Sequence, residues 1–98
     1  MSRSLVERRL TQVSERLKEL RAELSVTDEQ LAALADEADD TRLRALVSET
    51  PLAEAEHRDA QRHVDALAKH RATVQSAIER LESAQDELLD RLIARSRG

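Results

Sequence analysis

Residues 48–52 read Ser48-Glu49-Thr50-Pro51-Leu52, and this stretch decides the fold. Threonine is a favoured N-cap residue, and proline suits the first helical position because an N–H there would have no intrahelical partner. Glu54 follows in the first turn, where the helix dipole favours a carboxylate. The chain has one proline and one glycine, and the glycine is its last residue. The stretch therefore predicts that one helix ends just before Thr50 and a second begins at Pro51.

The residues before this stretch follow a heptad repeat, with core positions spaced alternately by four and three. They are Val6, Leu10, Val13, Leu17, Leu20, Leu24, Thr27, Leu31, Leu34, Ala38, Thr41 and Ala45. Such spacing is typical of the a and d positions of a coiled coil, and it predicts a helix over about 4–48. A capping-box pattern at Thr27-x-x-Gln30 and the poor helix formers Asp39-Asp40-Thr41 leave breaks near 25–28 or 39–41, and hence three helices, as the alternative.

The residues after the stretch repeat the pattern and predict a helix over about 51–95. Their core positions are Ala53, His57, Ala60, Val64, Leu67, Arg71, Val74, Ile78, Leu81, Gln85, Leu88 and Leu92. Two helices joined by a tight turn at 49–51 predict an all-α fold: residues 1–98 form a single antiparallel helical hairpin. Residue numbers facing each other should add up to about 99. This register places Arg71 beside Asp28, and Arg71 and Gln85 are interpreted as polar residues that fix the alignment.

Charges on the two helices are complementary in this register, which supports the hairpin. The acidic residues Asp36, Glu37, Asp39 and Asp40 are expected to face His57, Arg58, Arg62 and His63. The basic residues Arg8, Arg9 and Arg16 are expected to face Asp90, Glu87, Asp86 and Glu82.

Composition excludes several classes of function. The chain has no cysteine and no aromatic residue, so thiol chemistry and base stacking are ruled out. A formal charge of −4 does not favour nucleic acid. There is no phosphate-binding glycine loop and no nucleophile elbow, so we expect no enzyme activity and no cofactor. No apolar run is long enough for a membrane span or a secretory signal, and a cytoplasmic protein is expected.

A metal site is the one inorganic alternative that the residues offer. His63 and His70 share a helix face with Asp59, and Asp36 or Asp40 would approach from the other helix. The di-iron pattern Glu-x-x-His occurs once, at Glu54-Ala55-Glu56-His57, whereas a di-iron bundle uses two such motifs. The histidines are therefore interpreted as partners of the acidic stretch, and no metal is expected.

The turn and the start of the second helix read Leu43-Arg44-Ala45-Leu46-Val47-Ser48-Glu49-Thr50-Pro51-Leu52-Ala53-Glu54 and His57-Arg58-Asp59-Ala60-Gln61-Arg62-His63. This segment resembles short uncharacterised helical proteins of actinobacteria, a resemblance that implies a helical fold and brings no function. Arg71, Gln75 and Glu79 also loosely match the actinobacterial anti-sigma factors that bind cyclic di-GMP through a coiled-coil hairpin. Val64 and Ala68 stand where that pattern has Glu and Ser, so a nucleotide site is not carried over.

Large apolar residues outside the heptad core need a cover that one hairpin does not supply. They occur at the open end (Leu5, Leu89, Ile93) and near the turn (Leu43, Leu46, Val47, Leu52). We therefore expect a non-catalytic coiled-coil interaction module that dimerises into a four-helix bundle or docks on a larger protein. The alternative is a transcription-associated regulator, anti-sigma-like or polymerase-binding, that uses the acidic stretch. The candidate contact residues are Leu5, Leu88, Leu89, Leu92, Ile93, Asp36, Asp39 and Asp40.

Overall fold

The computed structural model describes residues 2–97 and confirms the all-α helical hairpin. Helix α1 spans Arg3–Ser48 and helix α2 spans Pro51–Arg97, with no strand among the described residues. The breaks considered near 25–28 and 39–41 do not occur. Thr27 and Thr41 are instead buried core residues, and the Thr41 hydroxyl donates to the Ala38 carbonyl at 2.8 Å. Because this bond satisfies the hydroxyl within its own helix, a threonine is accommodated in the core without a break.

The turn forms as the sequence predicts. The Glu49 N–H donates to the Ala45 carbonyl at 3.0 Å, and Glu49 adopts a positive φ of 52°, which ends α1. The Ala53 N–H donates to Thr50 Oγ1 at 3.2 Å, so Thr50 caps the first turn of α2. The chain direction therefore reverses through two non-helical residues, the left-handed Glu49 and the N-cap Thr50.

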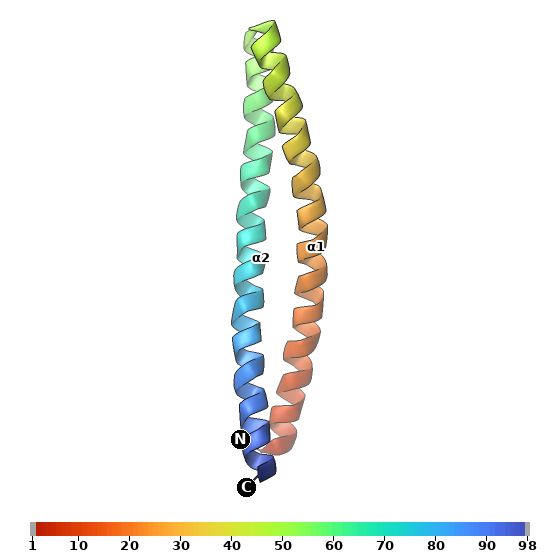
Figure 1. Ribbon diagram of the computed structural model, residues 1–98, viewed down its shortest axis with the longest axis vertical. Helices are drawn as coiled ribbons and strands as arrows, with labels where there is room; N and C mark the ends of the chain where they lie inside the picture. The colour runs from red at the N-terminus through yellow and green to blue at the C-terminus, as the bar shows by residue number, and fades with distance from the viewer. Residues whose placement is uncertain (1, 98) are drawn as a thin grey trace. The chain divides into compact units, whose positions relative to one another are not determined.

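The chain divides into two compact units. The terminal unit comprises Met1–Glu23 and Val74–Gly98, and the turn unit comprises Leu24–Thr73. In each unit, a part of α1 lies antiparallel beside a part of α2 (Figure 1).

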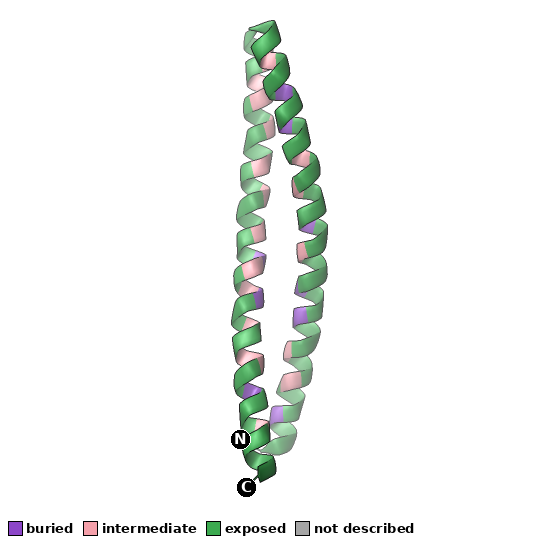
Figure 2. Cartoon of the chain, in the orientation of Figure 1, coloured by how far each residue is buried: buried purple, intermediate pink, exposed green. Residues whose placement is uncertain are grey.

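Burial follows the predicted heptad positions (Figure 2). Every described α1 residue that is buried or half-buried is one of the predicted core positions, and no predicted position is exposed. All predicted α2 positions are also buried or half-buried, and Ala55, Gln75, Ala77 and Ala84 join them. The buried apolar residues are Val6, Leu17, Leu20, Ala38, Val74, Ile78 and Leu88.

Three polar contacts fix the register in the two units. In the turn unit, Thr41 Oγ1 lies 3.4 Å from His57 Nδ1, and Arg71 Nε donates to Asp28 Oδ1 at 2.5 Å. In the terminal unit, Gln85 Nε2 donates to Ser14 Oγ at 3.1 Å. The paired residue numbers add up to 98 or 99. The expected alignment is confirmed, including the contact between Arg71 and Asp28.

The α2 members of these contacts recur with a regular interval. His57, Arg71 and Gln85 all occupy position a, and each is two heptads from the next. Val64 and Ile78 fill the intervening a positions, and Leu92 fills the next one. A helix shifted by one heptad would place Arg71 beside Leu20 or Leu34 instead of Thr27, so this residue disfavours the shifted register.

The expected charge pairing is only partly correct. Among residues 2–97, Arg62 pairs with Asp59 on its own helix and Arg16 pairs with Glu19 at 3.0 Å. Glu82 does form a pair between helices, but with Arg21 at 3.3 Å. The acidic residues at 36, 39 and 40 occupy positions f, b and c, which point away from the second helix of a hairpin and therefore do not reach its cations.

Candidate interaction surfaces

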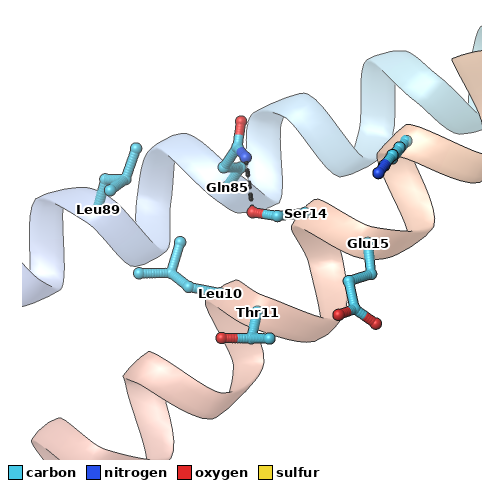
Figure 3. A pocket seen from close by; sticks show the side chains of 7 residues that line it. Leu10, Thr11, Ser14, Glu15, Gln85 and Leu89 are labelled. Atoms are coloured by element: carbon cyan, nitrogen blue, oxygen red, sulfur yellow. Dashed lines mark hydrogen bonds between the residues drawn. The ribbon is translucent and has the colours of Figure 1, made fainter.

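A shallow groove lies between the helices of the terminal unit (Figure 3). Its volume is about 470 Å³, and its lining residues define what we call the terminal groove. They are Leu10, Thr11, Ser14, Glu15, Lys18, Gln85 and Leu89. Leu10 of α1 and Leu89 of α2 reach into the space beside the Gln85–Ser14 hydrogen bond. The groove therefore has an apolar part formed by two leucines and a rim that carries both signs of charge.

The predicted contact residues at the open end have different surroundings. Leu89 is 42% exposed and Ile93, one turn further on the same face, is 50% exposed. Leu88 is buried and Leu92 is half-buried, because both occupy core positions between the helices. The Leu88 side chain is therefore not available to a partner.

Leu5 is exposed but does not join the patch formed by Leu89 and Ile93. Leu5 occupies position c of α1, whereas Leu89 occupies position e of α2. In an antiparallel pair, e positions lie together on one flank of the core and c positions lie on the other. The three residues were predicted as one group because they are all near the open end, but their different heptad positions place Leu5 on the opposite flank.

The most exposed large apolar residues of the described chain lie near the turn. Leu43 is 55% exposed, Leu46 is 63%, Val47 is 85% and Leu52 is 70%. The first three occupy positions f, b and c of α1, which form its outward side. They are neighbours on one helix face because they are spaced by three and four residues.

The predicted acidic residues lie on the same outward side of α1. Asp36, Asp39 and Asp40 are exposed, and none has an ion pair within residues 2–97. Each is one heptad before an exposed apolar residue: Asp36 before Leu43, Asp39 before Leu46, and Asp40 before Val47. We call these six residues the outer face. Both groups were predicted as separate contact candidates, and their common f, b and c positions are the sequence signal that joins them on one face.

The residues considered for a nucleotide site have partners within the protein. The raised pKa of Arg71 results from its hydrogen bond to Asp28 and from the charge of that carboxylate, and burial opposes the shift. Arg71 is therefore cationic throughout the neutral range. Gln75 donates to Glu79 Oε1 at 3.3 Å on its own helix. Arg71 and Gln75 are therefore each engaged in a contact within the protein.

The described residues contain no group of three His, Asp or Glu side chains that could hold a metal ion. Asp59, one of the candidate ligands, is paired with Arg62. Neither α1 nor α2, over residues 2–97, has a stretch long and apolar enough to cross a membrane.

Comparison of the chain with protein-family models, curated proteins and solved structures gives no match. The interaction surfaces must therefore be interpreted from their own geometry.

Proposed function

We propose that this protein is a non-catalytic interaction module whose terminal unit binds a second copy of the chain. The observation that carries the proposal is the exposed pair Leu89 and Ile93, which adjoins the terminal groove. Both residues lie on one face of α2, and the apolar area they expose is removed from water only by another molecule. Two hairpins packed through this face would form a four-helix bundle, the usual arrangement that covers such stripes.

The rim of the terminal groove supports a second copy as the partner. Glu15 and Lys18 line the same side of the groove and carry opposite charges. Because the charges of Glu15 and Lys18 cancel, two copies that meet at this rim do not repel each other through a shared net charge. Lys18 of each copy can also pair with Glu15 of the other.

The mass of the protein in solution tests the proposal. Light scattering over a range of concentrations is expected to show a dimer, and the double variant Leu89→Glu, Ile93→Glu is expected to be a monomer with unchanged helix content. The matched control is Leu46→Glu, Val47→Glu, which places the same charges on exposed apolar residues of the turn unit and should leave the dimer intact. A wild-type monomer at all concentrations would exclude self-association.

A second candidate function is favoured by the unpaired carboxylates of Asp36, Asp39 and Asp40. A regulator that contacts a basic surface of another protein, including a component of transcription, would use such charges for steering and specificity. Its binding should weaken steeply with salt and should be lost when the three charges are reversed. A lysine-rich peptide titrated at several salt concentrations is a suitable probe. Binding that is insensitive to both changes would eliminate this candidate.

A further inference from the structure

We propose that the outer face of α1 is a docking site for a partner helix that carries an apolar turn next to a cationic heptad. This proposal rests on the second candidate function and specifies the chemistry of the partner. It concerns the six residues Asp36, Asp39, Asp40, Leu43, Leu46 and Val47, which belong to one helix and one unit.

The first argument is the position of the apolar residues. Leu43, Leu46 and Val47 lie outside the core between α1 and α2 and are exposed, whereas Ala38, Thr41 and Ala45 fill the core positions of this region. Three large apolar side chains at spacings of three and four are the anchor pattern by which a helix binds in a groove or against another helix.

The second argument is charge. The three aspartates are exposed and have no cationic partner among the described residues, although Arg44 lies only one turn from Asp40. Carboxylates left without partners beside an apolar patch favour an occupant that brings its own cations. They disfavour a second copy lying along the full outer face in parallel, because each aspartate would then face an aspartate.

The third argument is the offset between the two groups. Each aspartate precedes its apolar counterpart by one heptad, so the acidic and apolar parts are separated by about 10 Å along the helix axis. A partner helix must therefore carry its apolar and cationic residues on one face and in adjacent heptads. A helix whose cations flank its apolar stripe along the whole length would match this surface less well.

A designed peptide provides the probe. A labelled helical peptide of leucine, lysine and alanine would place leucines at spacings of three and four in one heptad and lysines at the same face positions of the next. Both orders of the two heptads are needed, because α1 and the partner can pack parallel or antiparallel. A scrambled peptide of equal composition, with leucines and lysines alternating over both heptads, is the comparison.

Fluorescence anisotropy is expected to show that one ordered peptide binds the full chain at least about tenfold more tightly than the scrambled peptide. The variant Leu46→Glu, Val47→Glu should abolish binding, and Asp36→Lys, Asp39→Lys, Asp40→Lys should weaken it at least about tenfold at low salt. The matched charge control is Asp86→Lys, Glu87→Lys, Asp90→Lys, at exposed b, c and f positions of α2. This control and Leu89→Glu, Ile93→Glu should retain binding within about threefold.

Several outcomes would overturn the proposal. Equal binding of the ordered and scrambled peptides, or no binding of either, would contradict the proposed arrangement of apolar and cationic residues in adjacent heptads of the partner. If the Asp86, Glu87 and Asp90 variant lost as much peptide affinity as the Asp36, Asp39 and Asp40 variant, the peptide would be attracted to the overall negative charge of the protein. Loss of binding on charge reversal with no effect of Leu46→Glu, Val47→Glu would leave the acidic contact of the second candidate function and exclude the combined face. A loss of the dimer on substitution of Leu46 and Val47 would identify a second copy as the occupant.

Discussion

Arg71 Nε donates to Asp28 Oδ1 at 2.5 Å and joins two helices at residues 43 positions apart in the sequence. Arg71 occupies a core position, yet its side chain is 39% exposed, so the charge keeps contact with water. A partly hydrated ion pair of this kind contributes little to stability. The pair instead favours one alignment, since a shift by one heptad would place the arginine beside Leu20 or Leu34 instead of Thr27.

Replacing Arg71 should therefore affect thermal stability and helix alignment in different ways. We expect Arg71→Leu to raise the melting temperature by a few degrees, because the core gains an apolar residue, and to broaden the distribution of masses in solution. Thermal unfolding followed by circular dichroism, together with light scattering, measures both effects. Arg80→Leu, at an exposed position of the same helix, is the control and should change neither. A lower melting temperature for Arg71→Leu would mean that the ion pair is a major stabilising interaction.

The fully buried Leu17 should be the most sensitive position of the terminal unit. Truncation to alanine removes buried apolar surface and leaves a cavity, at an expected cost of about 2–3 kcal/mol in the free energy of unfolding. Leu46→Ala is the same chemical change at an exposed position and should cost less than about 0.5 kcal/mol. Urea denaturation of both variants gives the comparison. Equal losses would contradict the assignment of Leu17 to the core and Leu46 to the surface.

The fold was predictable because its signals are local and repeated. Alternating spacings of four and three identify the core positions of both helices, and Thr50 and Pro51 define the turn between them. The breaks considered at Thr27 and Thr41 illustrate the limit of propensity. A threonine disfavours a helix in isolation, but burial in the core of a long hairpin outweighs that preference.

The interaction surfaces were predictable only in part. Leu89 and Ile93 could be identified as apolar residues outside the core, but Leu5 lies on the other flank and Leu88 is buried. Proximity along the chain predicts which end of a hairpin a residue occupies, whereas the flank depends on its phase within the heptad. The partner of a surface is a property of a second molecule, so the surface chemistry of one chain constrains it without identifying it.

Thr50 should be the most sensitive polar residue of the turn. Its hydroxyl accepts the Ala53 N–H at 3.2 Å, and removal of this N-cap by Thr50→Ala should cost about 1 kcal/mol in the free energy of unfolding. Thr73→Ala is the matched control, because Thr73 is exposed within α2 and its hydroxyl donates to the Lys69 carbonyl of the preceding turn. Alanine has the higher helix propensity, so this control should be neutral or slightly stabilising. Urea denaturation distinguishes the two, and a cost at Thr73 equal to that at Thr50 would argue against the capping role.

Substitution of Glu49 by glycine should stabilise the turn, in contrast to the loss expected for Thr50→Ala. Its φ of 52° lies in the left-handed region, where a side chain beyond Cα is unfavourable and glycine is not. We expect Glu49→Gly to raise the free energy of unfolding by about 0.5–1 kcal/mol, because relief of this strain exceeds the added entropy of the unfolded chain. Glu54→Gly is the same substitution in the first turn of α2, where it should instead cost about 1 kcal/mol. Denaturation curves of the two variants should therefore shift in opposite directions. A loss of stability at Glu49 would show that its side chain contributes more to the turn than its backbone strain costs.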